Sequence, residues 1–295
     1  MISFKNGNLS VKATQADLKA DQAASQLKKA FEEHSVESIL IHDSAAYKEP
    51  YFTTVGPWVE ALGMEHTTCV TRIIIDTPSQ PQNRQSSTYI GDLSPLLEAQ
   101  TGLEELIVSG HFELSEFSHP TLKKAEFTKS AIQVADAETI GSHKCPSLSR
   151  LAVQGCEDGV PDGFGEALIK CFASNDIFGL DELYLFNTTQ GQEIVQGLCE
   201  NKLIEKIKVL DLNDHELGYD PDVTMEILEK NASQLKALDF LRIPFNSLMD
   251  DERERLKTVI PCIENSCPKD GYPADVPWYR PFLPQMYGAD DFDWK

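Results

Sequence analysis

Apolar residues recur along this chain in one short pattern, with two aliphatic positions three residues apart and a third two residues further on. Such spacing is typical of a strand that buries one of its faces. Eight segments fit the pattern in order, and their first positions are 19 to 34 residues apart. They are Val36-Ile39-Ile41, Val70-Ile73-Ile75, Leu103-Leu106-Val108, Leu122-Ala125-Phe127, Leu148-Leu151-Val153, Leu180-Leu183-Leu185, Ile207-Leu210-Leu212 and Leu235-Leu238-Phe240.

Stretches with helical spacing lie between several of these segments. Residues 161–173, 192–200, 222–230 and 250–259 place their apolar side chains three or four positions apart. The strand pattern is the LxxLxL signature of a leucine-rich repeat, whose apolar edge can be buried only against the next copy. We therefore expect an α/β solenoid of about eight repeats, with a curved parallel sheet inside and helices outside. Only Cys156 stands where the consensus expects Asn or Cys after the strand, so the usual side-chain hydrogen-bond ladder is absent or replaced.

The two ends of the chain differ from this middle part. Residues 1–34 alternate and then become helix-like, so we expect an N-terminal hairpin and helix that cap a solenoid of residues 35–262. Residues 263–295 form an extension rich in proline and aromatic residues. Proline forbids a regular helix there, while so many rings make a solvated tail costly. The extension is either a C-terminal cap or a docking peptide for another protein.

Charge and composition restrict the partners. The net charge is −21, which argues against nucleic acid and anionic membranes, since both attract basic surfaces. A basic protein would suit this charge; the alternative is that the charge only keeps the protein in solution. The sequence contains no run of about twenty apolar residues and no signal peptide, and its seven cysteines are odd in number and scattered. A cytoplasmic protein with free thiols is the expectation.

A search for chemistry returns no catalytic, cofactor or metal site. The glycines near residue 160 lack the lysine and strand context of a phosphate-binding loop, and no GxSxG or HExxH motif occurs. Cys262 and Cys267 are close in sequence, but no second pair with zinc spacing accompanies them. We expect a protein that is not an enzyme, and an enzyme with an unrecognised site is the remaining alternative.

The repeat pattern predicts which side chains face the hollow of the solenoid. Residues that alternate with the inward aliphatic positions point out of the sheet, and they form columns across the concave face. The side chains expected in a protein-binding surface there are Arg72, Ile107, Arg150, Tyr184, Phe186, Asp211 and Asp239. Tyr184 and Phe186 beside Arg150 are the best candidates for the contact site, because aromatic residues and Arg dominate binding hot spots. Phe186 packing under the following loop is the alternative.

Asp211 and Asp239 are expected at equivalent positions of adjacent strands. Two carboxylates at strand spacing, about 4.8 Å, could hold a cation or a basic side chain.

The segments that begin at Gly91, Leu180, Glu205 and Leu235 resemble a family of bacterial cytoplasmic leucine-rich-repeat proteins. The resemblance covers roughly residues 91–260. It implies the repeat fold, and it brings no biochemical activity and no catalytic residues to this chain. The function expected is a non-enzymatic scaffold that binds a protein through the concave face, and a bacterial effector exported to a host cell is the alternative.

Overall fold

The computed structural model describes ten ranges of the 295-residue chain. They are residues 2–13, 18–43, 55–77, 89–129, 132–155, 161–176, 179–186, 190–212, 221–243 and 249–265. The strands are β1 (Ile2–Lys5), β2 (Asn8–Ala13), β3 (Ser38–Asp43), β4 (Arg72–Asp76), β5 (Tyr89–Asp92), β6 (Glu105–Glu113), β7 (Lys124–Lys129), β8 (Arg150–Gly155), β9 (Glu182–Phe186), β10 (Val209–Asp211), β11 (Phe240–Ile243) and β12 (Ile263–Asn265). The helices are α1 (Ala20–Glu33), α2 (Gly56–Met64), α3 (Ser94–Ala99), α4 (Val134–Gly141), α5 (Phe164–Ser174), α6 (Gly191–Glu200), α7 (Pro221–Leu235), α8 (Asp250–Val259) and the short 3₁₀ helix η1 (Leu203–Lys206).

The strands form one open sheet in which chain order and spatial order agree. Eleven strands follow one another from β1 to β12, and β5 pairs with β6 outside this path. The hairpin of β1 and β2 is antiparallel, and each later pair is parallel. Seven of the eight segments predicted from the sequence lie at strands, which are β3, β4, β6, β7, β8, β9 and β10, and the eighth overlaps β11 only at Phe240. The sequence did not indicate β5 or β12.

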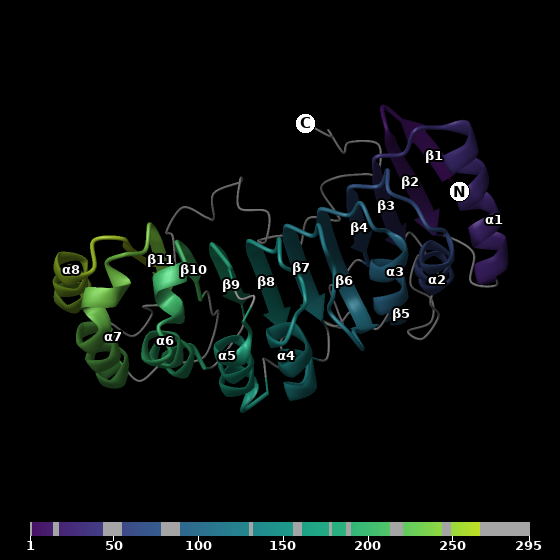
Figure 1. Cartoon of the computed structure of the whole chain (residues 1–295). Helices are drawn as coiled ribbons and strands as arrows, with labels where there is room; N and C mark the ends of the chain where they lie inside the picture. Colours follow the sequence, from purple (N-terminus) through teal and green to yellow (C-terminus); the bar gives the residue numbers. More distant parts are fainter. Residues whose placement is uncertain are drawn as a thin grey trace.

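The helices cover one face of this sheet. Figure 1 shows the row of strands bending along an arc, with α4 to α7 along its lower, outer side. Parallel strands joined by helices bury their apolar side against that helix layer. The inward aliphatic positions are accordingly buried: Ile39, Ile73, Leu106, Leu151, Leu183 and Leu210 are each 0% exposed. The four predicted helices are confirmed as α5 to α8, with ends that differ by a few residues, as is the N-terminal hairpin followed by a helix.

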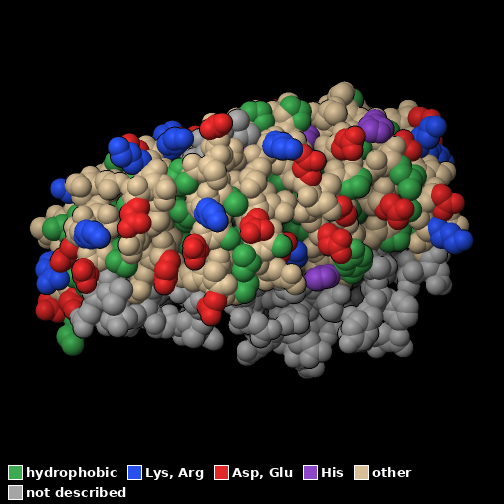
Figure 2. Space-filling model, turned by 60° about the horizontal axis from the view of Figure 1, so that its bottom comes forward, with side chains coloured by type: hydrophobic (Ala, Val, Ile, Leu, Met, Phe, Trp, Pro, Cys, Tyr) green, Lys and Arg blue, Asp and Glu red, His purple; other side chains and the backbone are tan. Residues whose placement is uncertain are grey.

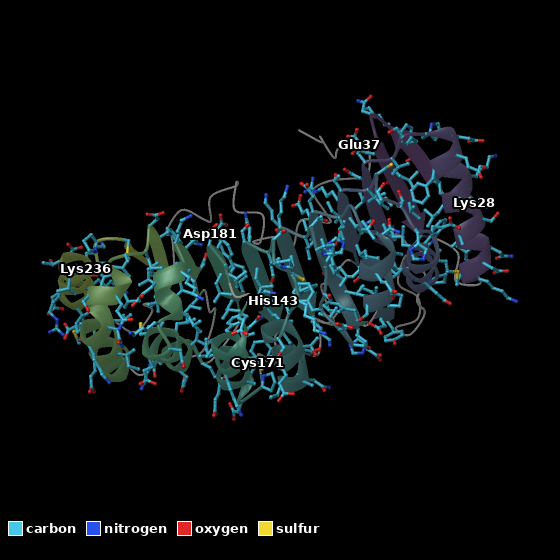
Figure 3. All side chains as sticks on the ribbon, in the orientation of Figure 1. Lys28, Glu37, His143, Cys171, Asp181 and Lys236 are labelled. Carbon is cyan, nitrogen blue, oxygen red and sulfur yellow. The ribbon has the colours of Figure 1, made fainter. Side chains whose placement is uncertain are left out.

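One hydrogen-bond arrangement recurs at the start of the strands. The carbonyl of the residue just before one strand accepts N–H groups from two successive residues of the next, as Glu104 does from Lys123 and Lys124. Glu37 and Asp181 occupy this position in their strands and lie along the same edge of the sheet in Figure 3. The acceptors are Gly7, Glu37, Thr71, Glu104, Lys123, Ser149, Asp181 and Lys208. Neighbouring units are therefore joined in the same way from β2 to β11.

The last predicted segment is displaced by three residues in the structure. Leu210 pairs with Leu241, where the sequence pattern placed Leu238. Leu235 is the last residue of α7 and is buried as part of that helix. The unit is therefore Leu238-Leu241-Ile243, all of whose side chains are buried.

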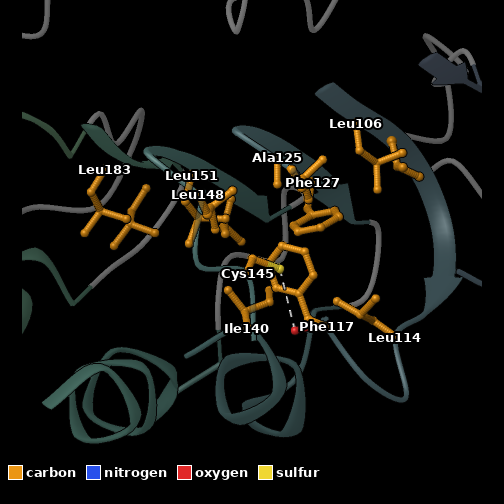
Figure 4. Close-up of a cluster of buried hydrophobic side chains, with 14 of the residues drawn as sticks. Leu106, Leu114, Phe117, Ala125, Phe127, Ile140, Cys145, Leu148, Leu151 and Leu183 are labelled. Atoms are coloured by element: carbon orange, nitrogen blue, oxygen red, sulfur yellow. Dashed lines mark hydrogen bonds between the residues drawn. The ribbon is translucent and has the colours of Figure 1, made fainter. Parts of the chain in front are cut away.

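The helix layer is interrupted in the middle of the molecule. Helices α1 to α3 pack in one series and α4 to α8 in a second. Between β6 and β7 the chain forms no helix, and Phe117 from this connection fills the space (Figure 4). Its ring packs edge-on against Phe127, 5.3 Å between centroids, and its carbonyl accepts the Cys145 thiol hydrogen bond. We call residues 114–123 the helix-free connection.

Several expectations fall outside the described residues. These include Cys267 and nearly all of the proline- and aromatic-rich extension, since the described chain ends at Asn265. The position of Cys156, which the repeat consensus singled out, also lies outside. The described sheet itself continues three residues past the expected solenoid boundary at residue 262, through β12.

Candidate functional site

The face of the sheet opposite the helices carries the predicted columns of side chains, and we call it the sheet face. The pairing from Leu40 through Ile74, Ile107, Glu126, Ala152 and Tyr184 to Asp211 follows the expected order. Leu40, Ile74 and Ala152 are 4%, 6% and 2% exposed, although they point away from the main core. These three therefore present little apolar surface to solvent.

Arg150, Glu182, Tyr184 and Phe186 form a connected group on β8 and β9, which we call the Tyr184 cluster. The Arg150 guanidinium carbon lies 4.8 Å from the centre of the Tyr184 ring, and Arg150 Nε lies 3.5 Å from a Glu182 carboxylate oxygen. Tyr184 donates its hydroxyl proton to Glu182 Oε2 at 2.9 Å. The Tyr184 and Phe186 ring centroids are 6.2 Å apart. Tyr184 is therefore in contact with Arg150 and lies near Phe186, and Glu182 binds both Arg150 and Tyr184.

The environment of Tyr184 keeps its hydroxyl protonated. Burial raises the pKa of Tyr184 most strongly, and the nearby Glu182 and Asp211 carboxylates raise it further. The Arg150 charge acts in the opposite direction. At neutral pH the phenol is therefore a hydrogen-bond donor on a rigid, half-buried ring. Rings of this kind supply contact area at low entropic cost when a partner binds.

Asp211 pairs with Arg242, and the predicted pairing of Asp211 with Asp239 is wrong. Arg242 stands opposite Asp211 in the strand register, and its Nη1 lies 3.1 Å from Asp211 Oδ2. The side chains are 9% and 1% exposed, respectively. The Arg242 guanidinium also lies 5.0 Å from the Phe240 ring centre. Asp239 precedes β11 instead, where its N–H bonds the Lys208 carbonyl, because the last unit is displaced by three residues.

Arg72 and Ile107 lie at their expected positions but apart from the Tyr184 cluster. Arg72 on β4 pairs with Glu105 on β6 at 3.0 Å, and His42 lies 3.5 Å from Asp76 at the other end of this region. Strand β7 stands between them and β8. Arg72 and Ile107 are thus separate from Tyr184 and Phe186. Among the described columns, aromatic side chains occur on β9, as Tyr184 and Phe186, and on β11, as Phe240.

Among the described residues, the α-helices carry an acidic excess and the columns of the sheet face do not. In the described columns of β2 to β11, five bases stand beside five acids: Lys12, Arg72, Lys124, Arg150 and Arg242 with Asp76, Glu105, Glu126, Glu182 and Asp211. Acidic residues outnumber basic ones in each described α-helix except α5. Figure 2 brings the helix side forward and shows acidic side chains spread across it, with basic ones between them.

Sequence reasoning missed a second set of polar side chains, located in the connections that precede the strands. Gln100 Nε2 donates to the Leu62 and Glu65 carbonyls at 2.7 and 2.6 Å, and His119 Nε2 contacts the Gln100 carbonyl at 2.9 Å. Asn175 likewise donates to two carbonyls of the preceding unit. These bonds join successive units of strand and connection. The sequence contained a signal for this set of side chains. Three residues before the first aliphatic position of a pattern segment stand Thr67, Gln100, His119 and Cys145.

The described residues offer limited means for chemistry. No group of three or more His, Cys, Asp or Glu among them could hold a metal ion. Burial raises the pKa of Cys145 to about 12 and that of Cys199 to about 11, so neither thiol is a nucleophile at neutral pH. Within the same ranges, no helix combines the length and apolar character needed to cross a membrane.

No protein-family model matches the chain, and no curated protein matches it either. The chain is similar to a protein of known crystal structure from Bacteroides fragilis, with a TM-score of 0.65 and 20% sequence identity. The match covers 87% of this chain and 74% of the other. At this identity the likeness concerns the fold alone: an α/β protein with an open, mostly parallel sheet.

Proposed function

We propose that this chain is a leucine-rich-repeat solenoid that acts as a non-enzymatic, cytoplasmic scaffold and binds a protein through its sheet face. The repeat assignment is supported by seven pattern segments at consecutive strands and by the recurring carbonyl acceptor at the strand starts. Stacked units of this kind display an extended surface, which suits binding of macromolecules. The free thiols Cys69, Cys145, Cys171, Cys199 and Cys262 are compatible with a reducing compartment.

The Tyr184 cluster is the observation that carries the binding proposal. Tyr184 and Arg150 belong to the residue types that most often dominate binding energies, and they are held together before any partner arrives. The hydrogen bond from Tyr184 to Glu182 and the cation–π contact with Arg150 reduce the side-chain freedom that would be lost on binding.

A basic protein is the proposed partner, and the charge distribution separates two roles. The acidic helices make the whole molecule attract a basic partner over long distances, which raises the association rate and is screened by salt. The sheet face has equal numbers of acidic and basic side chains, most of which are already paired, so it adds little long-range attraction. Its short-range contacts with the partner determine the dissociation rate of the complex.

The first experiment is affinity capture from a lysate of the source organism at low and high salt, with the partner identified by mass spectrometry. We then expect Tyr184→Ala and Phe186→Ala to weaken the partner's affinity by about tenfold or more each, chiefly through faster dissociation. Lys12→Ala, on the same face but at β2, is the matched control. Unchanged affinity in both aromatic variants would exclude the Tyr184 cluster as the contact site.

A further inference from the structure

Two buried histidines lie in the two adjacent chain segments at the interruption of the helix layer. His119 belongs to the helix-free connection, and His143 follows α4; each is 1% exposed. The backbone joins their segments, since Ser118 bridges Lys144, the His119 N–H bonds the Lys144 carbonyl and the Lys144 N–H bonds the Phe117 carbonyl. Figure 3 places His143 between the sheet and Cys171 of α5.

Both rings are held by the same local bond, which requires the neutral form. The Nδ1 atom of His119 accepts the N–H of Thr121, and that of His143 accepts the N–H of Cys145, each at 3.3 Å. A nitrogen that accepts a backbone N–H cannot carry a proton, so the hydrogen of each neutral ring is on Nε2. For His119 this Nε2 faces the Gln100 carbonyl. Protonation would place a second hydrogen on Nδ1, directly against a backbone N–H.

Burial disfavours a positive charge on both rings, and at His119 the Gln100 carbonyl offsets only part of this effect on the pKa. His143 contacts the Phe117 and Phe172 rings, with centroids 6.0 and 6.5 Å away. Titratable groups of the segments packed here include the Cys145 thiol, the Cys171 thiol, whose side chain packs against Gly141, and the exposed Glu116–Lys144 ion pair. In the described ranges, the ion pair that involves a histidine is that of His42 with Asp76, far from this region.

We propose that the contact between the helix-free connection and the turn after α4 is an acid-sensitive joint, which opens when His119 and His143 take up protons. Opening would separate the two helix series at the place where no helix packs across. The joint is closed while both rings are neutral, and it differs from the Tyr184 cluster in location and in the residues involved.

The direction of the pH effect follows from the burial. Desolvation lowers the pKa of His143 from 6.5 to about 4 and lowers that of His119 as well. The open form therefore binds more protons than the closed form, and stability of the joint is complete above about pH 6.5 and declines as the pH falls toward about 4. For His143 alone, lowering the pH from 7 to 5 should raise the opening equilibrium about 20-fold.

Hydrogen exchange of the full chain at pH 7 and pH 5, corrected for intrinsic rates, tests the joint. We expect residues 112–148 to exchange about 20-fold faster at pH 5, as follows from the pKa of His143, while α1 and α7 change little. The double variant His119→Asn/His143→Asn should lose this response. The Asn side-chain oxygen can accept the same backbone N–H, from the residue two positions later in the chain, but Asn does not titrate in this pH range. His66→Asn, at an exposed histidine, and Glu116→Gln, in the surface ion pair, should retain it.

Three results would overturn the proposal: no acceleration in this segment of the parent, a response that persists in the double variant, or equal acceleration along the entire chain. If the double variant does not fold, an NMR titration of the parent decides instead. The His143 ring should then remain mostly neutral at pH 5, and the pKa of the His119 ring should lie below its ordinary value. Rings that all titrate near pH 6.5 would contradict the joint.

Discussion

At the scale of single residues, the stability of the fold depends on apolar side chains at the buried pattern positions. Leu183 and Leu210 are completely buried between the sheet and the helices. Leu183→Asp or Leu210→Asp would place an unpaired carboxylate there, and we expect a loss of about 3 to 5 kcal/mol in the free energy of unfolding. Urea denaturation followed by circular dichroism measures it. Lys236→Asp, at an exposed position, should change stability by less than about 0.5 kcal/mol.

The cysteine thiols differ in reactivity because some are exposed and others are buried. Cys69 is exposed, whereas Cys145 and Cys199 are buried and their pKa values are raised to about 12 and about 11. In the folded protein at pH 8, a thiol-specific reagent should modify Cys69 within minutes and leave Cys145 and Cys199 unmodified until the chain unfolds. Peptide mapping by mass spectrometry identifies the modified residues. Early modification of Cys145 would show that the core around Phe117 opens readily.

The contact residues could be predicted from the sequence only where strand alternation decides their place. Alternation put Tyr184 and Phe186 on the sheet face, and the structure has Tyr184 beside Arg150 and Phe186 opposite Gln154. The buried pair of Asp211 and Arg242 could not be predicted, because it depends on the register between two strands. The contacts of His119 and His143 could not be predicted either, because they depend on which carbonyls and rings surround the two side chains in the folded chain.

At the scale of elements, the displaced last unit shows why the pattern alone was insufficient. Leu235-Leu238-Phe240 and Leu238-Leu241-Ile243 both satisfy the spacing. The length of α7, which extends to Leu235, decides between them. Helix ends are the least certain part of any assignment from sequence, so an error of three residues in α7 became an error of three residues in the strand.

The register between β10 and β11 can be tested through the buried Asp211–Arg242 pair. Arg242→Ala would leave the 1% exposed Asp211 carboxylate without this partner, and we expect a loss of about 3 kcal/mol or more. Asp239→Ala should cost less than about 0.5 kcal/mol, since Asp239 is exposed. The double variant Asp211→Asn/Arg242→Met should be more stable than Arg242→Ala alone. The reverse ranking of Arg242 and Asp239 would restore the register expected from the sequence.

The hydrogen bonds that join units at the helix ends lead to a second prediction at the scale of elements. Gln100→Ala removes two hydrogen bonds to carbonyls at the end of α2, and we expect a loss of about 1 to 3 kcal/mol. Gln196→Ala is the matched control, because Gln196 donates only to the exposed side chain of Glu200 within its own helix among the bonds described here. Thermal unfolding compares the two. Equal melting temperatures would mean that the Gln100 bonds contribute little to stacking.

For the whole molecule, the interruption of the helix layer is the main departure from a uniform array. Phe117 is the large side chain that spans it, in contact with the rings of Phe127 and His143. Phe117→Ala should cost about 3 to 5 kcal/mol and divide unfolding into two steps, one for β2 to β6 and one for β8 to β11. Phe164→Ala, within the second helix series, should cost as much while β8 to β11 still unfold together. Hydrogen exchange in increasing denaturant distinguishes the two patterns.

The unequal distribution of charge between helices and sheet gives the molecule two sides that an adsorbing surface can distinguish. On an aminated sensor chip or an anion-exchange bead, the helix side should attach first, since its acids exceed its bases. The sheet face, with its balanced columns, would then be turned toward the solution. Such immobilisation would present the Tyr184 cluster to an analyte in a uniform orientation, without an engineered tag.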